Sequence, residues 1–294
     1  MPAFARLVQA LASVDADAVV LVSPPVTHRP LAEVAVAAGC HVLVEKPLAL
    51  ELADATALAA LARVSGRRIM VAQNYRFRRQ SRALQGIVRA GALGSLHGIR
   101  IQCRRDFRLA RITRRDWRGH MAHPYLLDMA VHHLDLVRAI TGREIATVDA
   151  RGWTVPDSPF KHEPTVDALL TLDDGTPVAY EGNWAAYGAE TSWNGDWELV
   201  GSSGRATWTG GVANALRGTV HVERYGKARV RADLPRLPVI DRAACLHELR
   251  RAVWTGEEPE CAVGDNVRTL AAVLAVARSV DERRPVSTEE ILAG

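Results

Sequence analysis

The first 75 residues alternate between short apolar runs and helical segments, and this alternation constrains the fold more than any other feature of the chain. Three β-branched runs read as buried strands, at 17–23, 41–45 and 68–73. Segments with helical spacing precede or separate them, at 4–13, 29–38 and 51–65. Near-continuous apolar strands joined by helices are typical of a parallel sheet with helices on its faces.

From about residue 76 the pattern changes. Several strands follow one another over 145–225, separated by turns and without intervening helices, which favours a largely antiparallel sheet. The other expected elements are a helix at 80–90, a strand at 95–105, an arginine-rich loop at 106–120, and helices at 124–141, 241–255 and 265–281. The chain is therefore predicted to be a parallel α/β unit over 1–75 followed by an α+β domain over 76–294.

Composition and charge exclude several classes of protein. The chain has 37 basic and 33 acidic residues, and its arginines are scattered, so we expect no nucleic-acid partner. No apolar run reaches the roughly 18–20 residues of a membrane span, and the start does not resemble a signal peptide. The four cysteines form no CxxC pair, which argues against a disulfide framework, a metal site or an oxidising compartment. A cytoplasmic protein is expected.

Glu45-Lys46-Pro47 follows the second predicted strand. Ligands of open parallel sheets bind beyond the carboxyl ends of the strands, and a lysine there offers a mobile ammonium group with a tunable pKa. A solvated turn pair explains the position equally well. Only three of the 37 basic residues are lysines, so a lysine where this chain usually has arginine favours a function for Lys46.

A second candidate is the predicted helix that contains Asp128, His132 and Asp135. Their i, i+4 and i, i+3 spacings place all three on one face of an α-helix. A histidine held by a carboxylate is the usual general acid/base near neutral pH. The alternative is a helix cap with a buried structural histidine, which is also our interpretation of His133. The spacing matches no zinc motif, and no metal is expected.

These pieces, taken in chain order, resemble the glucose–fructose oxidoreductase and inositol dehydrogenase family (Gfo/Idh/MocA). The resemblance covers nearly the whole chain. The matching elements are the Ser23-Pro24-Pro25 loop with His28, the stretch 38–47 ending in Glu45-Lys46-Pro47, Asn74-Tyr75-Arg76-Phe77, Gly91-Ala92-Leu93-Gly94, Asp128 with His132-His133-Leu134-Asp135, and the closing stretch 265–286.

The resemblance implies an NAD- or NADP-dependent oxidoreductase that moves a hydride between the nicotinamide ring and a sugar, polyol or cyclic alcohol. Lys46 would hydrogen-bond the reacting hydroxyl, His132 would be the general acid/base, and Asp128 would orient His132 or the substrate. The residues implied on the cofactor side are Ser23, Pro24, His28, Glu45, Lys46, Asn74 and Arg76. Family analogy also implies a homo-oligomer formed through the antiparallel sheet. Trp193 and Trp197 could pack on a sugar, although filling of the sheet is the better interpretation.

Two departures from the family pattern matter. Ala122-His123 stand where the family often has a Gly-Gly pair, and no GxGxxG turn occurs in the chain. The resemblance thus implies an N-terminally truncated Rossmann sheet lacking about 60–70 residues, with the strand at 17–23 as an apolar edge and impaired cofactor binding. A mis-started gene model, a decayed fragment and a cofactor-free sugar-binding or protein-interaction remnant are the three interpretations. NAD and NADP are not distinguished.

Overall fold

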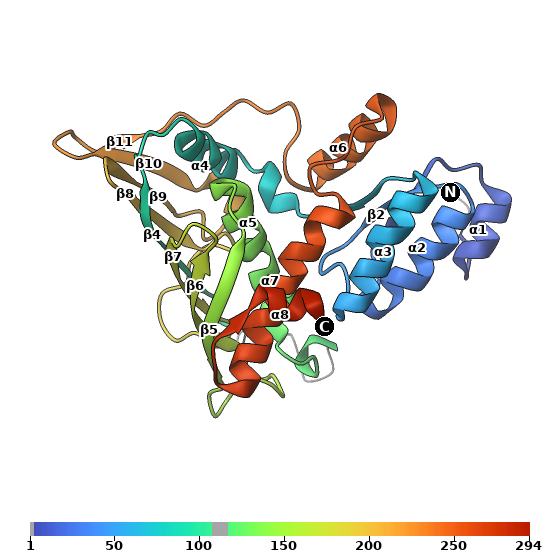
Figure 1. Cartoon of the computed structure of the whole chain (residues 1–294), viewed down its shortest axis with the longest axis horizontal. Helices are drawn as coiled ribbons and strands as arrows, with labels where there is room; N and C mark the ends of the chain where they lie inside the picture. The colour runs from blue at the N-terminus through green and yellow to red at the C-terminus, as the bar shows by residue number, and fades with distance from the viewer. Residues whose placement is uncertain (1–2, 108–116) are drawn as a thin grey trace. The chain divides into compact units, whose positions relative to one another are not determined.

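The structure is a computed structural model that describes residues 3–107 and 117–294. The chain divides into two compact units. Unit 1 comprises residues 1–77 and 239–270, and unit 2 comprises residues 78–238 and 271–294. Figure 1 shows both units and labels helices and strands where there is room. Among the residues described, no helix combines the length and the apolar character needed to cross a membrane.

Unit 1 is built on a three-stranded parallel sheet in the order β1-β2-β3. The strands are β1 (Ala18–Leu21), β2 (His41–Val44) and β3 (Ile69–Val71). The helices that precede or connect them are α1 (Leu7–Ser13), α2 (His28–Ala37) and α3 (Leu52–Ser65). Both pairings are parallel, so the predicted parallel sheet is confirmed.

The residues 239–270 belong to the core of unit 1. Helix α6 (Asp241–Thr255) buries Cys245 and Leu249 in one apolar cluster with Leu43 and Met70 from the sheet. The Val71 amide also bonds to the Cys261 carbonyl oxygen at 2.9 Å. The domain boundary predicted at 75/76 places this segment with the second domain. The sequence gives no indication that α6 buries its apolar face against the parallel sheet.

Strand β1 lies at an edge of the sheet that the described residues form. It pairs with β2 on one side, and Val20 and Val22 are 49% and 75% exposed. This agrees with the expected apolar edge, since a strand that pairs on one side leaves backbone groups and alternate side chains open.

Unit 2 is built on a nine-stranded sheet in the order β11-β10-β9-β8-β4-β7-β6-β5-β12. Its strands are β4 (Leu96–Arg104), β5 (Ile145–Trp153), β6 (Thr165–Leu172), β7 (Pro177–Asn183), β8 (Asp196–Gly201), β9 (Gly204–Thr209), β10 (Thr219–Arg224), β11 (Val230–Arg231) and β12 (Val286–Ser287). The β4–β7 pair is parallel and the other pairs are antiparallel. The expected α/β plus α+β fold class is confirmed.

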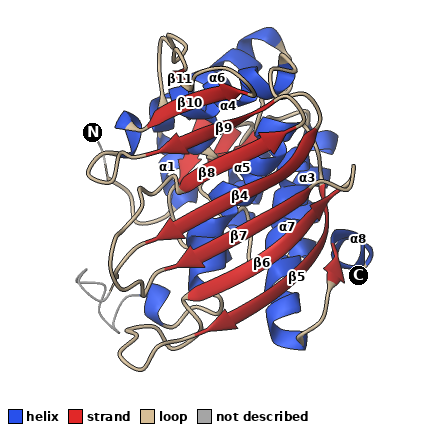
Figure 2. Cartoon of the chain, turned by 90° about the vertical axis from the view of Figure 1, so that its left-hand side faces the viewer, coloured by secondary structure: helices blue, strands red, loops and turns tan. Residues whose placement is uncertain are grey.

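Helices of unit 2 gather on one face of this sheet, as Figure 2 shows. They include α4 (Arg79–Arg89) and α5 (Val131–Thr141), which pack against each other. Helix α7 (Val263–Glu282) contributes its later turns to unit 2, and α8 (Thr288–Ala293) follows β12. The face toward the viewer in Figure 2 carries no helix among the residues described, and polar side chains alternate along its strands.

Candidate active site

The carboxyl ends of the unit 1 strands bring several predicted residues to one edge of the sheet. Ser23 and Pro24 follow β1, and Glu45 and Lys46 follow β2, which is the middle strand. Because the strands are parallel, these segments leave the sheet at the same edge, where ligands of open α/β sheets bind. Glu45 and Lys46 are both half-buried, and the Glu45 carboxylate accepts a hydrogen bond from the Lys46 amide at 3.2 Å.

His28 connects the two loops at this edge. Its imidazole is fully buried, with Nε2 3.0 Å from the Ser23 carbonyl oxygen and Nδ1 3.1 Å from the carbonyl oxygens of Pro47 and Leu48. The ring nitrogens therefore face protein backbone from the loops that carry Ser23 and Lys46.

Asn74 and Arg76 follow β3 and are both buried. The Arg76 guanidinium donates to Asp265 Oδ2 at 2.9 Å and to the Glu260 carbonyl oxygen at 3.1 Å, and the Asn74 amide donates to Asp241. These bonds tie the end of β3 to residues 239–270 within unit 1. The role of Asn74 and Arg76 toward a cofactor stays a prediction, and their visible contacts are structural.

Asp128 and His132 belong to unit 2. The helix predicted over 124–141 is present, but its first part is a π-helix (Leu126–Ala130) that continues into α5. Asp128 lies in the π-helical turn and His132 lies in α5, where it is 5% exposed. A π turn holds more residues than an α turn, so the i, i+4 spacing does not by itself guarantee the shared face that the sequence predicts. Single π turns within α-helices are frequent at functional sites.

Arg118 is a partner of Asp128 that sequence reasoning missed. Its Nε donates to Asp128 Oδ2 at 2.8 Å, and the Asp128 side chain is 16% exposed. Arg118 comes from the predicted arginine-rich loop, of which 108–116 lie outside the described residues. No periodic spacing connects a loop arginine to a carboxylate ten positions later, so only the tertiary structure could reveal this pair.

His133 is buried in unit 2 within a chain of hydrogen bonds. Its Nε2 must donate to the Trp193 carbonyl oxygen at 3.1 Å, because a carbonyl only accepts. In the neutral ring Nδ1 then accepts from the Tyr180 hydroxyl at 2.8 Å, and Tyr180 accepts from the Tyr125 hydroxyl at 2.8 Å. This geometry fits the structural role expected for His133.

Acid should destabilise the protein through His133. Burial, partly offset by the bond to Trp193, lowers its pKa from 6.5 to about 4. The unfolded chain therefore binds the proton first, and the stability present above pH 6.5 is lost as the pH falls toward 4. We expect this group to remove about 3 kcal/mol from the free energy of unfolding. Denaturant titrations from pH 7 to pH 4 should show a smaller loss in His133→Gln, and equal losses in both proteins would contradict the assignment.

His123 explains one departure from the family pattern. Its φ is +46°, in the left-handed region that favours glycine, and its Nε2 lies 3.1 Å from Asp281 Oδ2. The backbone thus keeps a conformation that glycine adopts without strain, while the ring gains a partner on α7.

Trp193 and Trp197 differ in their placement. Trp197 lies in β8, is 2% exposed and donates to the Asn194 carbonyl oxygen at 2.7 Å. Trp193 lies in the turn before β8 rather than in the strand, with the Arg105 guanidinium 4.7 Å from its ring centre. The two side chains therefore do not lie on one strand, and Trp197 fills the core.

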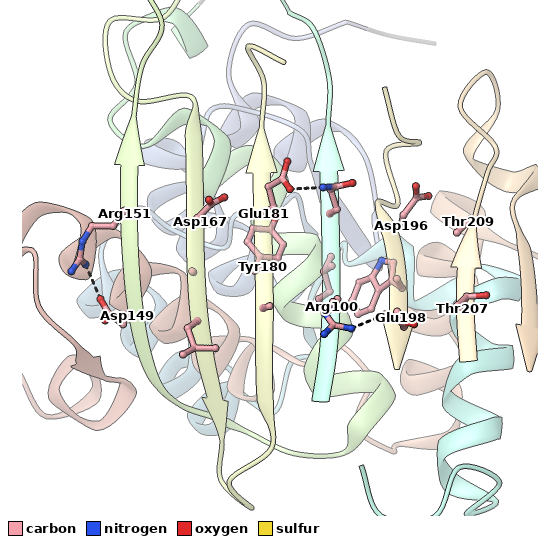
Figure 3. A pocket seen from close by; sticks show the side chains of 16 residues that line it. Arg100, Asp149, Arg151, Asp167, Tyr180, Glu181, Asp196, Glu198, Thr207 and Thr209 are labelled. Atoms are coloured by element: carbon pink, nitrogen blue, oxygen red, sulfur yellow. Dashed lines mark hydrogen bonds and ion pairs between the residues drawn. The ribbon is translucent and has the colours of Figure 1, made fainter. Parts of the chain in front are cut away.

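A shallow hollow of about 730 Å³ lies on the open face of the unit 2 sheet. Asp167, Glu181, Gln102 and Asp196 form a row across four adjacent strands, and Figure 3 shows the labelled acidic side chains along it. Burial and the neighbouring Glu181 charge raise the pKa of Asp167. Among the residues described, no group of three or more His, Cys, Asp or Glu side chains is placed to hold a metal ion.

Comparison with known proteins supports the resemblance. A model of the oxidoreductase family with an NAD-binding Rossmann fold matches residues 1–73, and a model of the GFO/IDH/MocA C-terminal domain matches residues 81–207. A dTDP-3,4-didehydro-2,6-dideoxy-alpha-D-glucose 3-reductase from Streptomyces violaceoruber is 31% identical over 280 residues, 92% of this chain and 77% of that protein. The chain belongs to the Gfo/Idh/MocA oxidoreductase family.

Two further relatives show a similar level of sequence identity to this chain. A myo-inositol 2-dehydrogenase from Thermotoga maritima is 27% identical over 296 residues, covering 95% of this chain and 81% of that protein. The solved structure of the UDP-N-acetylglucosamine 3-dehydrogenase GnnA from Acidithiobacillus ferrooxidans is 26% identical with a TM-score of 0.78, covering 96% and 83% of the two chains. The cofactor class of this Gfo/Idh/MocA protein is accordingly NAD or NADP.

Proposed function

We propose that this chain is an NAD(P)-dependent oxidoreductase acting on the hydroxyl or keto group of a sugar, polyol or cyclic alcohol. The observation that carries the proposal is the position of Lys46, directly after the middle strand of the parallel sheet, in the part matched by the NAD-binding model. The substrates named for its relatives, a nucleotide-linked hexose and an inositol, fall in this class.

The residues at the carboxyl edge of the unit 1 sheet fit the nicotinamide end of the cofactor. Ser23, Glu45 and Lys46 offer a hydroxyl, a carboxylate and an ammonium group there, and Pro24 lies exposed beside them. NAD(P) supplies the hydride acceptor or donor when bound. The GxGxxG turn that binds the pyrophosphate in Rossmann sheets is not found among the 294 residues.

The proposed chemistry divides between three side chains. Lys46 donates a hydrogen bond to the reacting oxygen and stabilises the negative charge that develops on it as its proton leaves. His132 accepts that proton in oxidation and returns it in reduction. Asp128, whose carboxylate accepts a hydrogen bond from Arg118, orients the imidazole or the substrate. The carbinol hydrogen leaves as hydride to the oxidised cofactor and the hydroxyl hydrogen leaves as the proton taken by His132, so the alcohol loses two electrons and two protons in all.

Turnover assays with a substrate panel test the proposal. NAD and NADP are supplied in turn with myo-inositol, free aldoses and nucleotide-linked hexoses. The absorbance of the reduced cofactor gives both the initial rate of its formation and the amount formed at equilibrium. Turnover that disappears in His132→Asn supports the assignment. Sugar binding without binding of either cofactor would favour the non-catalytic remnant instead, and calorimetric titration of NAD and NADP separates the two outcomes.

A second copy of the chain is the partner we propose for the open face of the unit 2 sheet. Acidic and basic side chains alternate there, with Arg100 bonded to Glu198 at 2.9 Å and Arg151 to Asp149 at 2.7 Å, while Leu169 is 55% exposed among them. A face with both charges in this pattern can be complementary to itself across a two-fold axis.

Replacement of Leu169 by glutamate should weaken this association. Leu169 pairs with Asp149 across β5 and β6, so a new carboxylate there adds like charge and removes apolar area. We expect the dimer dissociation constant to rise by about tenfold or more in sedimentation velocity. Leu246→Glu on α6 is the matched control, because Leu246 is 51% exposed and belongs to unit 1. A monomeric unchanged chain, or equal effects of both substitutions, would exclude this interface.

A further inference from the structure

The backbone that follows Lys46 contacts a buried ring inside unit 1, that of His28. The ladder between β1 and β2 ends where the Glu45 amide bonds to the Leu21 carbonyl oxygen at 3.0 Å. Beyond that bond the chain has left the sheet, and the Pro47 and Leu48 carbonyl oxygens lie 3.1 Å from His28 Nδ1. The segment that carries Lys46 is thus bounded by a strand bond on one side and by the imidazole on the other.

The other ring nitrogen connects the neighbouring loop. His28 Nε2 lies 3.0 Å from the Ser23 carbonyl oxygen, and Ser23 in turn has its hydroxyl 2.6 Å from that of Thr27. His28 is the first residue of α2 and is fully buried, so the ring is fixed by the helix start as well as by its contacts. A ring placed in this way joins the loop after β1 to the loop after β2.

We propose that His28 is a positioning residue, which sets the backbone of residues 46–48 and through it the place of the Lys46 ammonium group. The proposal rests on the proposed function of Lys46. In it His28 acts through the backbone of residues 46–48, whereas the resemblance implied that His28 contacts the cofactor directly. Both polar atoms of the ring are turned to protein carbonyls, and the fully buried side chain offers no other polar group. A small displacement of a reacting group is costly in catalysis, which gives such a residue a large effect without contact with the substrate.

The contacts of the two ring nitrogens can be tested separately by substitution. The amide nitrogen of asparagine reaches about as far as Nδ1, so His28→Asn keeps a donor beside the Pro47 and Leu48 carbonyl oxygens and removes the ring atom beside Ser23. The amide nitrogen of glutamine reaches about as far as Nε2, so His28→Gln keeps a donor beside the Ser23 carbonyl oxygen and removes the ring atom beside Pro47 and Leu48. Because a neutral imidazole carries one N–H, the pair of variants also shows which of these contacts the ring donates to. Both variants keep a polar side chain of similar size at one buried site, which makes each the control for the other.

The three lysines of the chain provide a readout that needs neither substrate nor cofactor. The intact 294-residue chain is treated with limiting acetic anhydride at one mildly alkaline pH, and the modification of each lysine is measured by peptide mass spectrometry. Lys161 and Lys227 are exposed in unit 2 and serve as internal references for the half-buried Lys46. The ratio of Lys46 to reference labelling reports the surroundings of its amine.

We expect this ratio to change by about threefold or more in His28→Gln and to stay within about twofold in His28→Asn, because ammonium reactivity follows its local environment. For a substrate that turns over, kcat of His28→Gln should fall at least about tenfold below that of His28→Asn, with a smaller change in KM. Equal labelling ratios in the two variants, or equal losses of thermal stability with unchanged Lys46 labelling, would overturn the proposal and leave His28 merely structural. Turnover retained in Lys46→Ala would instead refute the proposed function. The labelling ratios would still test whether His28 sets the surroundings of Lys46, because they are measured without substrate or cofactor.

Discussion

Replacement of Lys46 by alanine is expected to lower kcat by about 10³-fold, since removing one preorganised donor to a developing oxyanion costs about 10²–10³ and Lys46 also favours loss of the hydroxyl proton. The free energy of unfolding should change little, because Lys46 is half-buried in a loop at the edge of the sheet rather than in the core. Initial rates with the substrate found in the panel, compared with urea denaturation, check both parts.

Two further variants sharpen this expectation. Lys46→Arg keeps the charge but replaces a compact ammonium group by a planar fork, so it should recover little of the lost rate. Lys227→Ala removes an exposed lysine in unit 2 and should leave the rate unchanged. Full activity of Lys46→Ala would remove Lys46 from the mechanism.

The double variant Lys46→Ala/His132→Asn tests whether residues of the two units serve one step. Groups that act together in a single step lose activity non-additively, so the double variant should be hardly slower than the slower single variant. Losses that multiply would show that the two side chains act independently and would contradict their assignment to one proton transfer.

Replacement of Gly182 by alanine is expected to lower the free energy of unfolding by about 3 kcal/mol, the upper range for overpacking a core. A Cβ at Gly182 in β7 would overlap the ring of Tyr125, which is 1% exposed. Displacement of that ring also removes the hydroxyl of Tyr125 from Tyr180, and with it the chain that ends at His133. The melting temperature should fall by roughly 6–12 °C, measured by circular dichroism.

Gly86→Ala is the matched control for this substitution. Gly86 lies in α4, where a Cβ meets nothing within 4 Å, so alanine there should stabilise the helix by about 0.5–1 kcal/mol. Tyr125→Leu combined with Gly182→Ala should recover part of the loss, because the smaller side chain leaves room for the new methyl group. A melting temperature of Gly182→Ala equal to that of the unchanged chain would show that the Tyr125 ring can move away without cost.

Much of the fold could be predicted because its signals are local. The apolar runs at 17–23, 41–45 and 68–73 contain β1, β2 and β3, and the predicted helix 241–255 is α6 with the same bounds. Periodicity reports which residues are buried in each element. It does not report which element covers them, so the packing of α6 in unit 1 could not be foreseen.

The candidate site divides in the same way. Lys46 was found from residue type and position along the chain, both of which are local. Arg118, the π-helical turn at Asp128 and the contacts of His28 with Pro47 and Leu48 depend on backbone groups and side chains from separate segments.

The sequence by itself determined the family, the cofactor class, the order of strands and helices and the residues proposed for catalysis, because motifs and periodicity are written along the chain. Only the tertiary structure decided what holds those residues. It turned His28 toward carbonyl oxygens, paired Asp128 with Arg118 and placed Tyr125 over Gly182. Such contacts join positions far apart in the chain, and buried polar groups select their partners by distance and geometry rather than by spacing in sequence.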